Sequence, residues 1–351
     1  MSEKSQAQDV GLKTFVAPTG VGTPGELRGP VDEDSARWGK ARKLALAHLD
    51  RILELVPKIL RSENPDRIHD LRVASRRLQA VLDVLTATPA SSSLRRLRRK
   101  IKRSRTIFSD VRNCDVLIGQ IERRLKRRRA GRRKAWNAAL DYLRERRSKA
   151  CARAVRKLAK INLGRVYIRL QSSLAPPPGT VGRNGQRDMP GVDARDVRLE
   201  SRLTEELEKA WLQFRAELAQ SQQSLTGRSI HKARIAAKEL RYLVEVMDEF
   251  RIPGSWDATR WLRQVQQYLG DWHDLDVAEQ MLAEMLARPQ FVLDQLEIAA
   301  EVIKLILLER KMKRDLAINY QKMALASAEG ARLQAWVETL LTSKDSSLDV
   351  P

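Results

Sequence analysis

The sequence has few of the residues from which large β-sheets, disulfide-rich domains and membrane spans are built. Aromatic residues make up 5% of the 351-residue chain, which argues against a large sheet. Two cysteines, Cys114 and Cys151, cannot form a disulfide framework and are typical of a reducing compartment. The most apolar run, residues 302–308, contains Lys304 and is too short to cross a bilayer.

Acidic residues are also scarce relative to basic ones. The chain has 66 Lys and Arg against 44 Asp and Glu, a formal net charge of +22. This charge predicts a polyanionic partner: nucleic acid, an anionic membrane surface or a polyphosphate-like polymer. Residues 95–160 hold 26 Lys and Arg against 5 Asp and Glu, whereas residues 194–351 hold 22 against 25. Clustered cations in the second half are therefore stronger evidence for an anion-binding site, because the net charge of that half is close to zero.

The first ten residues, MSEKSQAQDV, are polar and lack the apolar segment of a signal peptide. We therefore expect a cytoplasmic protein without a membrane partner. Leu, Ala, Arg and Glu are abundant, and all four favour helices. The composition predicts an all-α fold.

Composition and periodicity divide the chain into five segments. We predict a flexible N-terminal arm at 1–34, a first helical half at 35–171, a Pro/Gly-rich linker at 172–193, a second helical half at 194–341 and a tail at 342–351. Asn64-Pro65 is a helix-start signal, because Asn caps a helix and Pro suits its first turn. We expect helix breaks near residues 109–110 and 270–271.

The stretch Ile68–Leu85 forms an amphipathic helix if it turns by about 100° per residue. Six apolar side chains from Leu71 to Leu85 gather on one face. The opposite face carries a cationic stripe that begins with histidine: His69, Arg72, Arg76 and Gln79, with Asp83 at its end.

A second copy of this pattern occurs at Ile230–Met247. Its stripe comprises His231, Arg234, Lys238, Arg241 and Glu245. Residues 109–116 (SDVRNCDV) likewise match residues 270–277 (GDWHDLDV), at an offset of 161 residues against 162 for the stripes. Two matches in nearly one register indicate an internal duplication, which predicts two pseudo-twofold-related four-helix bundles.

Three other interpretations of these residues are open. A charged helix face is usually only a solvated surface, but both stripes start with histidine in a chain that has four. His69-Asp70 and His273-Asp274 fit an HD-type metal phosphohydrolase, but neither pair is kept in the other copy, and arginines beside His69 would repel a dication. The Arg95–Lys160 region could bind nucleic acid, although it lacks interleaved aromatics for base stacking.

The repeated blocks resemble those of the CHAD domain, a family named for its conserved histidines in an α-helical domain. The residues that carry the resemblance are HDLRVASRRL from His69, HKARIAAKELRYLVE from His231, Arg112-Asn113-Cys114-Asp115-Val116 and QQYLG at 266–270 with Asp274. Asn113 stands where the family has aspartate. The resemblance covers about residues 35–341 and implies two helical bundles around a basic cavity that binds inorganic polyphosphate.

The resemblance also implies which residues bind the polymer. They are His69, Arg72, Arg76, Arg77 and Arg112 in the first half, and His231, Arg234, Lys238 and Arg241 in the second. Arg77 lies off the stripe and is matched by Glu239.

We therefore expect a non-enzymatic polyphosphate-binding protein, without a cofactor or metal, that resides in the cytoplasm on polyphosphate granules and binds nucleic acid weakly. Binding should depend steeply on salt and should strengthen at slightly acidic pH, because phosphates favour charged histidines. A nucleic-acid-binding protein is the second hypothesis and a phosphohydrolase the third.

Overall fold

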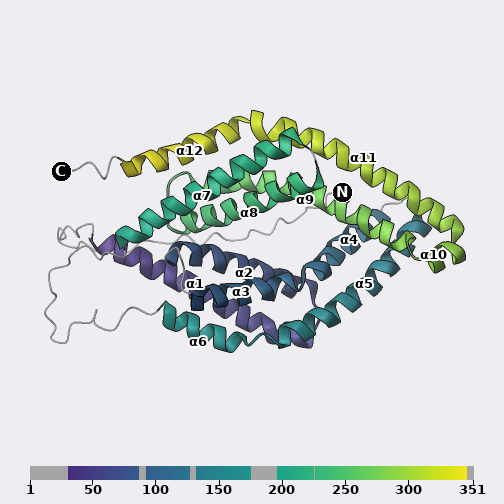
Figure 1. Cartoon of the computed structure of the whole chain (residues 1–351), viewed down its shortest axis with the longest axis horizontal. Helices are drawn as coiled ribbons and strands as arrows, with labels where there is room; N and C mark the ends of the chain where they lie inside the picture. Colours follow the sequence, from purple (N-terminus) through teal and green to yellow (C-terminus); the bar gives the residue numbers. More distant parts are fainter. Residues whose placement is uncertain (1–30, 87–91, 127–131, 175–195, 225, 346–351) are drawn as a thin grey trace, which may run out of the picture.

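The computed structural model describes residues 31–86, 92–126, 132–174, 196–224 and 226–345. In these ranges all regular secondary structure is helical, in twelve helices (Figure 1). The all-α prediction is therefore confirmed. No helix in these ranges is both long and apolar enough to span a membrane.

Six helices of this part of the chain come from the first half. They are α1 (Val31–Arg61), α2 (Pro65–Leu85), α3 (Ser92–Thr106), α4 (Ser109–Leu125), α5 (Arg133–Ala159) and α6 (Leu163–Ser173). The second half contributes α7 (Asp196–Gln223), α8 (Gly227–Glu249), α9 (Ser255–Leu286), α10 (Pro289–Asp294), α11 (Leu296–Ala326) and α12 (Ala328–Asp345).

The two halves lie against each other as two layers, with α1–α6 below and α7–α12 above in Figure 1. Their packing follows the same order: α1 packs on α2 and α4 on α5, while α7 packs on α8 and α9 on α11. The helix α2 also contacts α8 across the boundary between the layers. The two predicted stripe helices are therefore neighbours.

Local sequence signals fix the starts of both stripe helices. The Asn64 side chain accepts hydrogen bonds from the backbone N–H groups of Asp66 (2.8 Å) and Arg67 (3.3 Å), and Pro65 occupies the first turn of α2. At α8, Thr226 and Ser229 cap the helix reciprocally, so its N-terminal N–H groups are satisfied. The apolar faces of both helices are buried.

The expected helix break at residues 270–271 is wrong. The helix α9 runs through Gly270 without interruption, whereas the matching region of the first half breaks at residues 107–108. A glycine inside a helix costs about 1 kcal/mol relative to alanine. The buried neighbours Leu269 and Trp272 anchor this stretch to the core, and such burial outweighs that cost.

The hydrophobic core is shared between the halves. One cluster of buried residues joins α1–α3 and α6 with α7, α8 and the first part of α9. A second cluster joins α4 and α5 with the end of α9 and with α11, at the right of Figure 1. Each cluster contains residues of both halves, so neither half completes a core without the other.

Helices extend slightly beyond the predicted segment boundaries. The helix α1 begins at Val31, inside the predicted arm, and α12 ends at Asp345, inside the predicted tail. Residues 1–30, 175–195 and 346–351, which hold most of the predicted arm, linker and tail, lie outside the described residues.

Candidate functional site

A cavity of about 810 Å³ lies between the two halves, among α2, α3, α7 and α8. The cationic stripes supply seven of its lining residues: Arg72, Arg76, Gln79 and Asp83 from α2, and His231, Arg234 and Lys238 from α8. The predicted stripes thus lie at one cavity. Burial is the main reason that the pKa values of Arg234 and Lys238 are lowered, and the charge of Arg76 from the other half acts in the same direction.

Two further predicted residues lie beside the cavity. His69 and Arg112 are not among its lining residues. Their charges are nevertheless close to the stripe, because Arg112 contributes to lowering the pKa of His69 and that of Arg72.

Arg77 and Arg241 are placed elsewhere, at a shared carboxylate. The carboxylate of Glu245, whose side chain is 13% exposed, forms ion pairs with Arg241 of α8 (2.5 Å), Arg263 of α9 (3.3 Å) and Arg77 of α2 (3.6 Å). The guanidinium of Arg241 also lies over the Tyr242 ring, 4.4 Å from its centroid. Arg77 therefore joins the halves through Glu245, Arg241 pairs with Glu245 within α8, and neither arginine lines the cavity.

Replacing Glu245 by glutamine is expected to destabilise the protein by about 2 kcal/mol, because it leaves the partly buried Arg241 without a charged partner. The shift is measured as a lower urea midpoint. Glu249→Gln, an exposed position on the same helix, is the control and should leave the midpoint unchanged. Equal midpoints for the two variants would show that this carboxylate is not an anchor.

The helix α3 contributes cations to the cavity wall that were not predicted from the sequence. Arg98, Lys102 and Arg105 line the cavity from this helix, at a spacing of four and three residues that places them on one side. Arg105 is tied to Gln79 on the α2 stripe. The spacing is a usable signal, but α3 also carries Arg95, Arg96, Arg99, Lys100 and Arg103, so angle alone could not show which cations face the cavity.

The cavity carries more positive than negative charge. Eight of its lining residues are Lys or Arg and three, Asp83, Glu206 and Glu239, are acidic, a formal net charge of +5. Two of the acids are paired, Asp83 with Arg98 and Glu206 with Lys209. Loss of water around Glu239 raises the pKa of its carboxyl group, which weakens its value as a counter-charge.

Burial lowers the pKa of five cavity cations: Arg72, Arg98, Arg105, Arg234 and Lys238. Burial, followed by the charges of Arg234, Arg76, Arg72 and Arg241, lowers the pKa of Lys238 to about 6. Burial and neighbouring arginines lower the pKa of Arg72 to about 10. Arg72 is fixed by hydrogen bonds to the Arg105 carbonyl (2.9 Å) and the Ser109 hydroxyl (3.0 Å). These groups are held close together without enough anions, and such an arrangement favours an anionic ligand.

Burial favours the neutral form of the histidines near the site. It is the main reason that the pKa values of His69 and His231 are lowered, and nearby arginines act in the same direction. His273 lies 5.7 Å from His231 between ring centroids, and burial together with Arg234 lowers its pKa to about 3. A bound anion would act in the opposite direction and favour the charged rings.

The histidine-aspartate pairs do not assemble into a metal site. Among the residues that the structure describes, no three His, Cys, Asp or Glu side chains lie together in a metal-binding arrangement. The charged groups that act on His231 include Arg234 and Lys238, and these cations would repel a dication.

Comparison with known proteins identifies the family. The family model described as the CHAD domain matches residues 43–283. The chain belongs to the CHAD domain family. A crystal structure of the CHAD domain from the plant Ricinus communis is similar, with a TM-score of 0.52 and 20% sequence identity over 86% of this chain and 91% of that chain. At this identity the likeness shows a shared fold. No curated protein matches the chain.

The repeated Asp-Val pair of this CHAD domain lies within helices α4 and α9 and connects them to their neighbours. The carboxylate of Asp115, 4% exposed, accepts a hydrogen bond from Arg147 of α5 (2.5 Å), and its counterpart Asp276 accepts one from Lys313 of α11 (2.8 Å). These two carboxylates join α4 to α5 in one half and α9 to α11 in the other.

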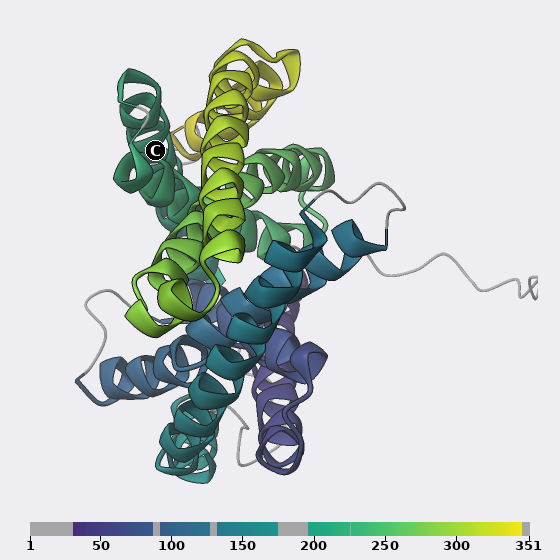
Figure 2. The ribbon, with the colours of Figure 1, turned by 90° about the vertical axis from the view of Figure 1, so that its right-hand side faces the viewer.

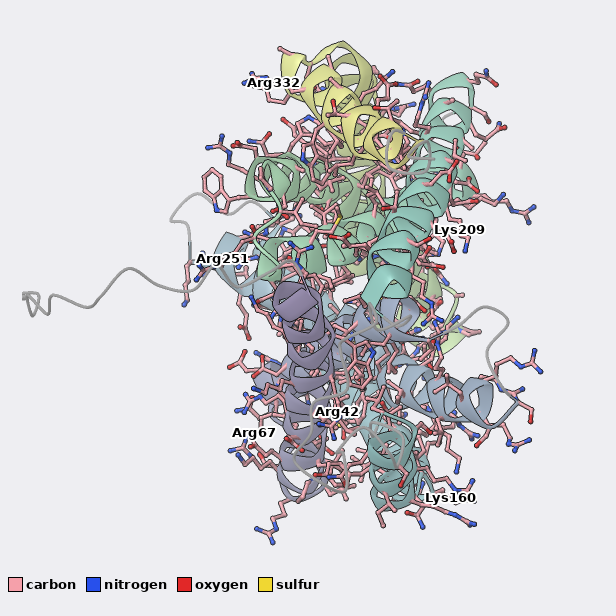
Figure 3. The ribbon with its side chains drawn as sticks, turned by 90° about the vertical axis from the view of Figure 1, so that its left-hand side faces the viewer. Arg42, Arg67, Lys160, Lys209, Arg251 and Arg332 are labelled. Atoms are coloured by element: carbon pink, nitrogen blue, oxygen red, sulfur yellow. The ribbon has the colours of Figure 1, made fainter. Side chains whose placement is uncertain are left out.

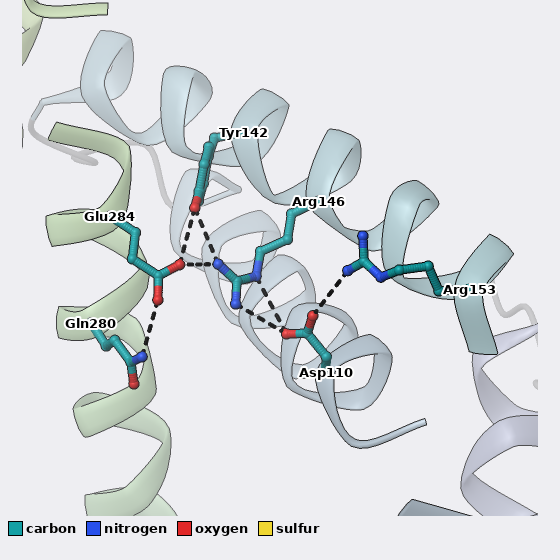
Figure 4. A network of polar contacts seen from close by, with 6 residues as sticks. All are labelled: Asp110, Tyr142, Arg146, Arg153, Gln280 and Glu284. Carbon is teal, nitrogen blue, oxygen red and sulfur yellow. Dashed lines mark hydrogen bonds and ion pairs between the residues drawn. The ribbon is translucent and has the colours of Figure 1, made fainter. Parts of the chain in front are cut away.

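A network of polar contacts around Arg146 also connects the two halves (Figure 4). Arg146 of α5 bonds Asp110 of α4 and Glu284 of α9, and it also donates to Tyr142. These contacts give Asp110 of the repeat a structural role as a partner of Arg146.

Proposed function

We propose that this CHAD domain protein binds inorganic polyphosphate in the cavity between its halves, without catalysing a reaction, and that it resides on cytoplasmic polyphosphate granules. The supporting observation is the lining itself: eight Lys and Arg face three acids, two of which are already paired. A linear polymer of phosphates supplies the missing negative charge at every repeat.

The kinds of cation in the cavity suit phosphate. The planar guanidinium group of arginine can donate two hydrogen bonds to phosphate oxygens, and lysine adds a compact charge. Arg76 and Arg234 come from opposite halves, so one strand of polymer can touch both. Its binding would offset the repulsion that lowers the pKa of Lys238.

The cavity offers little for reading nucleic-acid bases. Single-stranded nucleic acids are held by aromatic side chains on which bases stack. Among the described lining residues Tyr242 is the aromatic one, it is 8% exposed, and Arg241 lies over its ring. This favours a polyphosphate ligand over a nucleic acid.

A competition experiment tests the proposal. Labelled long-chain polyphosphate is bound to the full-length protein near physiological salt and displaced by unlabelled polyphosphate, duplex DNA or RNA at matched phosphate concentration. Unlabelled polyphosphate should displace the label at a concentration at least about tenfold lower than either nucleic acid, because stacking and base contacts are missing while the phosphate contacts remain.

Two results would contradict the proposal. Equal displacement by DNA would favour the hypothesis of a nucleic-acid-binding protein. Release of orthophosphate from the polymer on addition of a divalent metal would restore the hypothesis of a phosphohydrolase.

A further inference from the structure

The helix α3 has a cationic surface that the cavity does not use. Its 15 residues include eight Lys and Arg and no acid. Leu97, Ile101 and Ser104 are buried, and they define the side of the helix that packs on the core. Arg98, Lys102 and Arg105 occupy the cavity side. The other five cations, which we call the outer row, are exposed: Arg95, Arg96, Arg99, Lys100 and Arg103.

The charges of the outer row are unpaired within the described part of the chain. Among the residues that the structure describes, none of its five side chains makes an ion pair or a side-chain hydrogen bond, whereas Arg98 and Arg105 on the cavity side are paired with Asp83 and Gln79. Like charges three or four residues apart, such as Arg96, Arg99 and Arg103, repel each other on a helix. This repulsion reduces the stability of α3 in the free protein. A bound polyanion would weaken the repulsion.

The outer row continues the cavity lining. At about 100° per residue, Lys102, Arg99 and Arg95 follow one another around the solvent side of α3 within about 60°. Lys102 lines the cavity, so this row leads from the cavity edge to the outside of the helix. Figure 2 shows α3 (blue, lower left) standing away from the body of the molecule, with its N-terminal end farthest out. This surface is accessible to a large ligand.

The cavity of about 810 Å³ can hold only a short segment of a long polymer. The remainder of the polymer must leave across the rim of the cavity. The helix α3 forms part of this rim, and its outer row carries positive charge that makes no ion pair within the described residues. We propose that the outer row of α3 is a second polyphosphate-binding surface, which holds the segment of a long chain that emerges from the cavity. This inference rests on the proposed function and adds to it a preference for long chains.

The test compares two ligands that differ in length. The variant Arg95→Gln/Arg99→Gln/Arg103→Gln removes three outer-row charges while keeping residues that favour helices. For long-chain polyphosphate we expect about tenfold weaker binding, because each exposed phosphate contact changes affinity severalfold at most. Tripolyphosphate, which fits within the cavity, should bind the variant and the unmodified protein equally.

A matched control removes the same charge from the second half. Arg260→Gln/Arg314→Gln/Arg332→Gln changes three exposed positions on α9, α11 and α12 and should leave binding of both ligands within about twofold of the unmodified protein, because these charges lie away from α3 and are screened. Circular dichroism of both variants verifies that they are folded.

Several outcomes would overturn the inference. They are unchanged binding of long chains by the outer-row variant, an equal loss for tripolyphosphate and the long chain, or a loss as large in the control. A variant that loses duplex DNA binding but keeps long-chain polyphosphate would assign this surface to nucleic acid. If the unmodified protein binds neither polyphosphate, the proposed function itself fails and the inference fails with it; binding by the unmodified protein and by the variant alike refutes the inference alone.

Discussion

The variant Arg76→Gln/Lys238→Gln is expected to bind long-chain polyphosphate about 1,000-fold more weakly than the unmodified protein at physiological salt. A charge-assisted hydrogen bond contributes about 1.5–3 kcal/mol, and two lost contacts therefore cost a factor of this size. Both side chains line the cavity, one from each half. Fluorescence anisotropy with labelled polyphosphate measures the loss.

The salt dependence of binding provides a second measurement on the same variant. The slope of log affinity against log salt should become shallower by about 1.5, because two phosphate contacts no longer release counterions. A variant that had merely lost some of its folded fraction would keep the slope. This separates the loss of contacts from the loss of structure.

The matched control is Arg67→Gln/Lys232→Gln, which changes the same residue types on α2 and α8. Neither residue lines the cavity. Lys232 is exposed, and Figure 3 labels Arg67 at the outer edge of the lower half, far from Lys209 of the cavity wall. If this control loses as much affinity as the cavity variant, a general positive field accounts for binding and the stripes do not. Undiminished binding after substitution of His69, Arg72 and Arg76 would contradict the stripe assignment as well.

Binding is also expected to take up protons, so that long-chain polyphosphate binds about tenfold more tightly at pH 6 than at pH 8. In the free protein, burial and neighbouring arginines hold the pKa of Lys238 at about 6. A bound polyanion favours the charged ammonium group and raises this pKa. Affinity then rises as the pH falls from the raised pKa of the complex, and it levels off below the pKa of the free protein, where Lys238 is already protonated.

The variant Lys238→Arg tests whether Lys238 is the group that takes up a proton on binding. A guanidinium group remains charged throughout the range, so the variant should keep its affinity at pH 6 and lose much of the difference between pH 6 and pH 8. His69 and His231, whose pKa values are lowered mainly by burial, account for what remains. Equal affinity of the unmodified protein at the two pH values would contradict charge uptake at the site, and a full pH response in Lys238→Arg would place the proton elsewhere.

Local chemistry explains why much of the fold could be predicted. The start of α2 follows from the Asn64 side chain and Pro65, which act within one turn. The apolar faces of α2 and α8 follow from helical periodicity, and they are buried as expected. The break at Gly270 was predicted incorrectly because glycine has a local preference, whereas the burial of Leu269 and Trp272 depends on other helices.

The residues of the candidate site were also predicted correctly only in part. Arg72, Arg76, His231, Arg234 and Lys238 were predicted from repeated spacing and line one cavity. Arg241 was predicted from the same spacing and Arg77 from the family resemblance, but both pair with Glu245 and neither lines the cavity. The spacing on one helix does not show which neighbour will supply a carboxylate, so such pairing is decided by the helices that meet there.

The sequence by itself determined the all-α fold, the two stripe helices and the excess of positive charge, because each depends on composition or on contacts within a few residues. The tertiary structure decided that both stripes meet at one cavity, that α3 adds Arg98, Lys102 and Arg105 to its wall, and that burial there lowers the pKa of Lys238. These properties arise when cations distant in the sequence are brought together and lose their water, and that proximity exists only in the folded chain.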